Sequence, residues 1–100
     1  MSAATAWVRE RLAGAPPELV EAMVRAVPAG DDVAEALARG AETLYARVLR
    51  GKGGREDALP LLAADALLTH ALEAKAEADP DGLAEFAVRW GGAGRLGALA

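Results

Sequence analysis

The sequence predicts an all-α protein, a compact bundle of four or five helices packed around a long central helix at about residues 57–78. Composition is the first indication, because alanine and leucine, two of the strongest helix formers, supply 26 and 14 of the 100 residues. Valine, with seven copies, is the only abundant strand former. Spacing is the second indication, since apolar residues recur at intervals of three and four along successive segments.

Two short helices are expected in the first third of the chain, at about residues 5–13 and 17–27. Pro16 and Pro17 favour the start of the second helix, because the first turn does not need their missing N–H groups. The buried side of each helix is predicted from residues spaced by four. In the first helix these are Ala4, Val8 and Leu12, flanked by Trp7; in the second they are Leu19, Met23 and Val27, flanked by Val20 and Val24.

A third helix is expected after Gly30, with Asp31 or Asp32 as its N-cap and Glu35 placed as in a capping box. Its buried face is predicted to consist of Val33, Leu37, Leu44 and Val48. Glu–Arg pairs spaced by four residues support three of the predicted helices independently of hydrophobicity. They are Glu21 with Arg25, Glu35 with Arg39, and Glu85 with Arg89.

The long helix follows a glycine-rich loop at residues 51–55. At about 100° per residue, Leu61, Leu68 and Leu72 cluster on one side, which we expect to face the core. Ala64 and Ala71 lie on one flank of this stripe, Asp65 lies on the other, and Ala63, Ala66 and Ala74 occupy the far side. Because two of its faces are apolar, we expect this helix at the centre of the bundle.

Asp79 and Pro80 end the long helix and begin the last one, which is expected over about residues 80–90. Its buried stripe is predicted to consist of Leu83, Phe86, Ala87 and Trp90. Residues 1–91 are therefore predicted to form a single helical domain. Residues 92–100 are predicted to form a flexible glycine-rich tail, whose Leu96 and Leu99 could dock.

Composition limits the chemistry that we expect. The chain holds no cysteine, one serine and one histidine, so neither a hydrolytic triad nor a thiolate metal site is expected. His70, Glu73 and Glu77 share one helix face but are expected to face solvent without a metal. No secretory signal and no apolar stretch of about 18 residues is visible, which predicts a cytoplasmic protein with no membrane partner. Nine arginines against two lysines are typical of a GC-rich bacterial genome.

Asp65 is the main candidate for a binding role. A carboxylate beside leucines either reaches water or is buried and needs a partner, because an unpaired buried charge is very costly. Thr69, one turn later, and an arginine from elsewhere are the expected partners. A structural aspartate and a role in recognising a ligand or subunit both stay open. Trp7 and Trp90 are core residues in the simplest interpretation, and an exposed tryptophan would be an interface anchor.

Four cations gather around the glycine-rich loop: Arg47, Arg50, Lys52 and Arg55. The start of the long helix favours anions, so one interpretation is contact with a phosphate or an RNA backbone. The other is a solvated basic loop, because Glu56 and Asp57 already bring negative charge to this helix start. The formal net charge of −4 opposes general affinity for nucleic acid, so we expect no nucleic-acid partner.

Together these observations predict a small non-catalytic helical interaction module, either self-associating or an accessory subunit of a larger protein. Its core is weak in leucine-sized side chains, and association would bury more surface. The first alternative is a small-molecule-binding protein or enzyme subunit with a site around Asp65, in the bundle or at a dimer interface. The second is a weak phosphate or RNA contact through the loop from Arg47 to Arg55. No cofactor is expected, and the expected partner is a protein or a second copy in a homo-oligomer.

Overall fold

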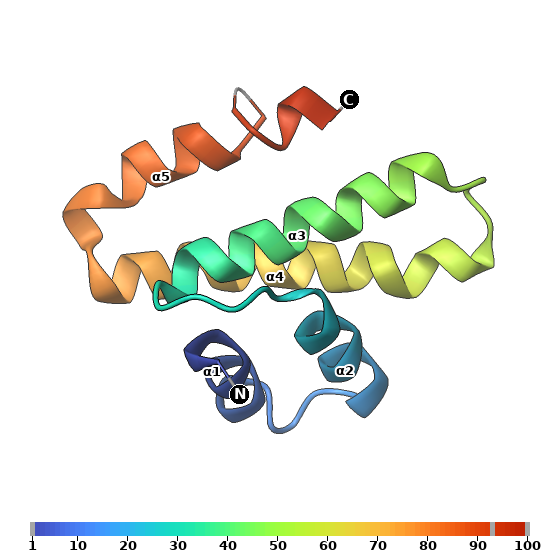
Figure 1. Cartoon of the computed structure of the whole chain (residues 1–100), viewed down its shortest axis with the longest axis horizontal. Coiled ribbons are helices and arrows are strands. Elements are labelled where there is room, and N and C mark those ends of the chain that lie inside the picture. The colour runs from blue at the N-terminus through green and yellow to red at the C-terminus, as the bar shows by residue number, and fades with distance from the viewer. Residues whose placement is uncertain (1, 93, 100) are drawn as a thin grey trace.

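The computed structural model describes residues 2–92 and 94–99, and these residues form helices, turns and loops without strands (Figure 1). The α-helices of this part are α1 (Ala3–Arg11), α2 (Pro17–Ala26), α3 (Val33–Arg50), α4 (Ala58–Ala78) and α5 (Leu83–Trp90). Short 3-10 turns precede α4 and α5, at η1 (Arg55–Asp57) and η2 (Pro80–Gly82), and a third, η3 (Gly97–Leu99), lies after α5. The predicted all-α bundle with a long central helix is confirmed. None of the described helices is both long and apolar enough to cross a bilayer.

The hairpin of α3 and α4 forms the long axis of the molecule (Figure 1). α1 and α2 pack across one side of this hairpin, and α5 with the C-terminal turn lies along the other side. α4 is central because it contacts α2, α3 and α5. The loop end of the hairpin extends beyond both outer layers, so surface near that end is left uncovered.

Side-chain caps explain where two of the helices begin. The Ser2 hydroxyl accepts the N–H of Thr5 at 3.2 Å, so α1 begins earlier than predicted. Asp32 Oδ1 accepts the N–H of Glu35 at 3.1 Å and caps α3, as the capping pattern predicts. Both bonds are local, so the start of each helix is set by residues within one turn of it.

The loop between α3 and α4 is closed by Asp57, which makes no capping bond to α4. Its carboxylate accepts the N–H of Gly53 at 2.9 Å. Gly53 has a φ of 74°, in the left-handed region that glycine adopts without a steric cost. The resulting turn holds Lys52 and Arg55 at the tip of the hairpin.

The buried face of α4 differs from the prediction. Its buried residues are four alanines, one leucine and one proline: Ala63, Ala64, Ala71, Ala74, Leu67 and Pro60. The predicted core stripe lies beside this face, since Leu61 is 42% exposed and Leu68 and Leu72 are half-buried. Close packing is the reason, because a Cβ at Gly40 of α3 would lie 3.2 Å from Leu67 Cδ1. Apart from Leu67, which Gly40 accommodates, the seam takes small side chains, and the other leucines pack at its flank.

On the other helices the predicted faces supply most of the core, which includes Ala4, Val8, Met23, Leu37, Leu44, Phe86 and Trp90. Several further residues of those faces, such as Leu19, Val33 and Val48, are half-buried. Ala87 is the exception, because the prediction placed it inside and the structure exposes it. The short helix α5 buries only Phe86 and Trp90, and Ala87 lies on its exposed side.

The predicted Glu–Arg pairs are only partly formed. Glu35 and Arg39 pair at 3.2 Å within α3. Glu21 instead pairs with Arg9 of α1 at 3.1 Å, and Arg89 pairs with Glu35 across two helices. These exposed contacts therefore link neighbouring helices, although each such pair stabilises the fold by only about 0–1 kcal/mol.

After α5 the chain folds back on itself. The N–H of Arg95 donates to the carbonyl of Arg89 at 2.8 Å, and that of Leu96 to the carbonyl of Trp90 at 3.1 Å. The Arg95 guanidinium also donates two hydrogen bonds, of 2.9 and 3.0 Å, to Glu42 of α3. The end of the chain is thereby tied to both α5 and α3.

This turn carries the two leucines that were expected to dock. η3 contacts α3, and both Leu96 and Leu99 line a groove against the α3–α4 hairpin. Their docking agrees with the expectation, whereas the flexibility of residues 92–100 stays a prediction. Ala93 and Ala100, which belong to that predicted tail, lie outside the described residues.

Candidate functional site

An apolar groove of about 370 Å³ opens between the C-terminal turn and the loop end of the α3–α4 hairpin. It is lined by Tyr45, Val48 and Leu49 of α3, by Leu61 and Leu68 of α4, and by Gly91, Gly92, Leu96, Gly97 and Leu99. No charged side chain belongs to this lining. Leu49 is 58% exposed, and Leu61 is also open to solvent. The groove is therefore an apolar surface that the described helices leave uncovered.

Asp65 is not a lining residue of this groove, but it lies one turn after Leu61 and contacts Tyr45, which both line it. Its carboxylate oxygen Oδ1 accepts the hydroxyl of Tyr45. Burial raises the pKa of Tyr45 above its ordinary value, and the hydrogen bond to Asp65 raises it further. Thr69 and an arginine were expected as partners of a buried carboxylate, but Asp65 reaches water, as the other alternative predicts, and its hydrogen-bond partner is Tyr45. Asp65 itself is exposed and has no ion pair among the described residues.

Asp65 belongs to a strip of exposed residues along the N-terminal half of α4. At about 100° per residue, the members of this strip fall within one third of the helix circumference. They are Ala58, Leu61, Leu62, Asp65 and Thr69. Leu62 is 55% exposed, so the strip is apolar at its centre. The structure thus places Asp65 and Thr69 together on a surface that no described helix covers.

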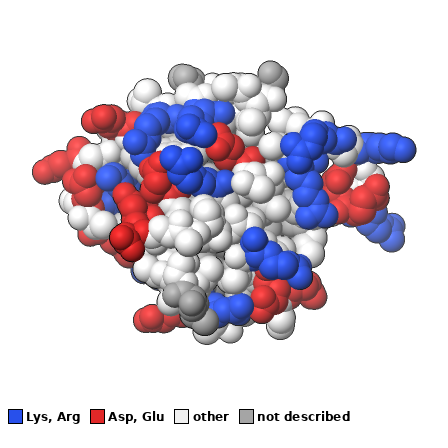
Figure 2. Space-filling model, viewed as in Figure 1, with Lys and Arg blue, Asp and Glu red and all other residues white. Residues whose placement is uncertain are grey.

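The four predicted anion-contact residues lie around the loop end of the hairpin: Arg47, Arg50, Lys52 and Arg55. All four are exposed, and Figure 2 shows basic side chains gathered at this end around a smaller acidic group. Within residues 2–92 and 94–99 none of them forms an ion pair. By contrast, the arginines over α5 and the C-terminal turn are paired with Glu35 and Glu42. Phosphate or RNA contact through the loop stays a prediction.

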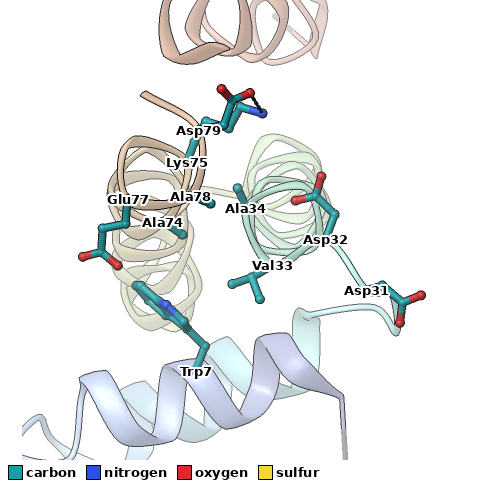
Figure 3. Close-up of a pocket in the computed structure, with 10 residues that line it drawn as sticks. All are labelled: Trp7, Asp31, Asp32, Val33, Ala34, Ala74, Lys75, Glu77, Ala78 and Asp79. Atoms are coloured by element: carbon teal, nitrogen blue, oxygen red, sulfur yellow. Dashed lines mark ion pairs between the residues drawn. The ribbon is translucent and has the colours of Figure 1, made fainter. Parts of the chain in front are cut away.

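A larger cavity, of about 640 Å³, lies between α1, the start of α3 and the end of α4 (Figure 3). Three of its carboxylates already have partners within the protein: Asp32 caps α3, Glu77 pairs with Arg11 at 2.9 Å, and Asp79 pairs with Lys75 at 3.1 Å. The side chain of Asp31 points away from the cavity (Figure 3). The charged groups of this cavity therefore serve the fold, and we favour the groove as the functional site.

His70 was expected on the solvent side of the long helix, and this was wrong. Its side chain is 19% exposed, and its ring packs edge-on against Trp7 of α1 at 5.8 Å between centroids. Because the true core face centres on the alanines and Leu67, the histidine side of α4 is turned toward α1. Its Nδ1 lies 3.7 Å from Glu73 Oε2, beyond hydrogen-bonding distance. The described residues contain no group of three potential ligands arranged to hold a metal ion.

Neither tryptophan belongs to the groove lining, although Trp90 directly precedes the lining residue Gly91. Trp90 is fully buried, and the Arg95 guanidinium lies 5.0 Å from its ring centroid. Trp7 is half-buried, with the Arg11 guanidinium 4.4 Å from its ring. The four interface candidates therefore lie in two different places. Asp65 and Thr69 lie on the exposed strip, whereas the two tryptophans pack within the bundle. Whether any of the four binds a partner stays a prediction.

Sequence reasoning missed Tyr45 and Leu49 as residues of the groove. A signal was present, because Leu49 and Leu62 are large apolar residues outside the predicted stripes of two helices joined by a short loop. Such a loop makes its helices antiparallel neighbours, which brings these leucines to one end of the hairpin. No model of a known protein family, no curated protein and no solved structure matches this chain.

Proposed function

We propose that this protein is a small non-catalytic interaction module that binds a protein surface through the groove and the exposed strip of α4. The supporting observation is the exposure of Leu49, Leu61 and Leu62 at one end of the hairpin. Isolated surface leucines are ordinary, but a contiguous apolar patch beside a groove is typical of a binding surface. Water leaves such a surface when a partner covers it, and this release favours association.

The polar groups at the groove suit binding better than proton transfer. The Tyr45 hydroxyl is protonated near neutral pH, as that of an ordinary tyrosine is, and acts as a donor to Asp65; its raised pKa extends this state to higher pH. The second oxygen of Asp65 can accept a hydrogen bond or face a cation from a partner. The Tyr45–Asp65 pair therefore provides a fixed polar contact beside an apolar surface, as in many protein interfaces.

The test compares two glutamate substitutions at exposed apolar positions. Leu61→Glu places a charge in the groove, whereas Val88→Glu places one on α5, where the valine is 66% exposed. Both variants should fold, because neither side chain belongs to the core. We expect Leu61→Glu to lose association with itself or with a partner captured from the source organism, and Val88→Glu to keep it. Association that is identical in the wild type and both variants would refute this function.

A second candidate function is binding of a small molecule around Asp65. A volume of about 370 Å³ falls within the usual range of ligand pockets, roughly 300–1,000 Å³, and a single carboxylate beside an apolar wall suits a cationic ligand. Thermal-shift screening of amine-containing compounds tests this candidate. A stabilising compound should lose its effect in Asp65→Asn and keep it in Asp31→Asn, since Asp31 lies outside the groove.

A further inference from the structure

We infer that the partner at this surface is a second copy of the chain, docked antiparallel along α4 so that Asp65 of each copy faces Arg55 of the other. This inference rests on the proposed function, because it uses the same groove and strip. It adds the identity of the partner and the register of the contact.

The spacing of residues along α4 sets this register. A two-fold axis that crosses the helix at residue 60 relates positions that lie at equal distances on either side of it. Asp65 is five residues after this point, and Arg55 is five residues before it, in the η1 turn that leads into α4. Leu62 and Ala58 are related in the same way, two residues on either side. Each contact between two such positions therefore occurs twice in the dimer.

The shapes of the exposed side chains fit this arrangement. Ala58 is exposed and small, so it leaves space beside the helix for Leu62 of the second copy. Leu61 lies close to the axis and borders the groove that Leu49 also lines. A large side chain opposite a small one allows two helices to approach closely. The exposed strip thus carries both Leu62, which projects, and the space beside Ala58 that would receive Leu62 of the second copy.

Charge supports the same register. Neither Asp65 nor Arg55 has an ion pair among the residues that the structure describes. Arg50 and Lys52 lie at the same tip of the hairpin, which adds positive charge near the place where Asp65 of the second copy would lie. Of the two acids at this tip, Asp57 is already occupied with the N–H of Gly53. Opposite charges at matched positions favour one register over others.

The contact is expected to be weak, because the exposed strip covers only half of one helix. Interfaces smaller than about 1,200 Å² in total belong to transient complexes. Association should therefore be measured by sedimentation equilibrium from about 10 µM to about 1 mM. We expect a monomer–dimer equilibrium that weakens with added salt, since exposed charges contribute to it.

Charge reversal tests the register directly. Asp65→Arg and Arg55→Asp should each raise the dimer Kd about tenfold, because each creates two like-charge contacts per dimer. The double variant should return the Kd to within about threefold of the wild type, since the contacts are then reversed but still complementary. Val88→Glu serves as the control and should leave the Kd unchanged.

Cross-linking gives an independent measurement, because the chain has no cysteine of its own. Leu61→Cys lies near the proposed axis, so two copies should be joined by a short bis-maleimide. Val88→Cys should not be joined at the same concentration. A failure to cross-link Leu61→Cys would overturn the arrangement, even if a dimer is found.

The outcomes separate this inference from the proposed function. A chain that stays monomeric at about 1 mM, or a dimer insensitive to Asp65→Arg, overturns the second-copy inference. If that monomer still captures a partner that Leu61→Glu abolishes, the interaction module remains supported. If no groove-dependent partner exists either, both proposals fail.

Discussion

Gly40 of α3 faces Leu67 of α4 at a point of close approach between the two helices. A Cβ atom at Gly40 would lie 3.2 Å from Leu67 Cδ1 and 3.3 Å from the carbonyl oxygen of Ala26. Contacts this short leave little space for a methyl group. Because Gly40 has no Cβ, α2 and α4 can pack closely on α3, and the alanines of α4 extend this close seam.

Replacing Gly40 by alanine should destabilise the protein. Alanine favours a helix interior by about 1 kcal/mol over glycine, but overpacking a core costs about 1–3 kcal/mol. Because one of the crowded atoms is a backbone oxygen, we expect Gly40→Ala to lower the free energy of unfolding by about 1 kcal/mol. Urea denaturation measures this change. Gly30→Ala is the control, since nothing lies within 4 Å of its Cβ, and it should stabilise by about 0.5 kcal/mol.

A pair of leucine truncations tests which face of α4 is the core. Leu67 is fully buried, so Leu67→Ala should lower the free energy of unfolding by about 3 kcal/mol. Leu61 is partly exposed, so Leu61→Ala should cost less than about 1 kcal/mol. Both values come from urea denaturation under identical conditions. Equal costs would instead favour the leucine stripe as the core of the bundle.

The helices could be predicted from the sequence because their signals are local. Asp32 at an N-cap and Pro17 in a first turn act within a few residues, and such signals do not depend on the rest of the chain. The core face of α4 could not be predicted in this way. Alanine and leucine occupy several sides of α4, so periodicity alone does not show which of its apolar faces is buried in the core. The choice depends on residues of another helix, since Gly40 of α3 leaves room for the side chain of Leu67.

At the candidate site, too, the sequence predicts single residues but not their contacts with other helices. Asp65 and Thr69 could be singled out because a polar residue among leucines is unusual, and both lie on the exposed strip. Tyr45 could not be paired with Asp65, because twenty residues separate them and their contact depends on the register of α3 against α4. Sequence patterns thus identified the unusual residue, while its hydrogen-bond partner came from tertiary structure.

The cap on α3 gives a local prediction with a close control. Asp32 accepts the N–H of Glu35, so Asp32→Ala leaves that donor without its side-chain acceptor and should cost about 1 kcal/mol. Asp31 is the adjacent, exposed carboxylate and is not the cap residue of α3. Asp31→Ala should therefore change the free energy of unfolding by less than about 0.5 kcal/mol. A reversed order of the two values would argue that α3 is capped by the first aspartate.

The hydrogen bond from Tyr45 to Asp65 predicts a dependence of stability on alkaline pH. The pKa of Tyr45 is raised in the folded state, first by burial and then by Asp65, whereas an unfolded tyrosine ionises near about pH 10. Below that pH the phenol is protonated in both states, and its contribution to stability is fully present. As the pH rises above it, the unfolded state loses its proton first, so this contribution is lost.

Tyr45→Phe isolates this effect because phenylalanine keeps the ring and removes the hydroxyl. Near neutral pH the variant should be less stable than the wild type by about 0.5–1 kcal/mol, since the bond is partly exposed to water. The difference should narrow as the pH rises above about 10, because only the wild type carries the ionisable hydroxyl. Urea denaturation of both proteins below and above this pH measures the difference and cancels the alkaline effects that they share. A difference that stays constant would mean that the hydroxyl of Tyr45 meets the same surroundings in the folded and unfolded chain.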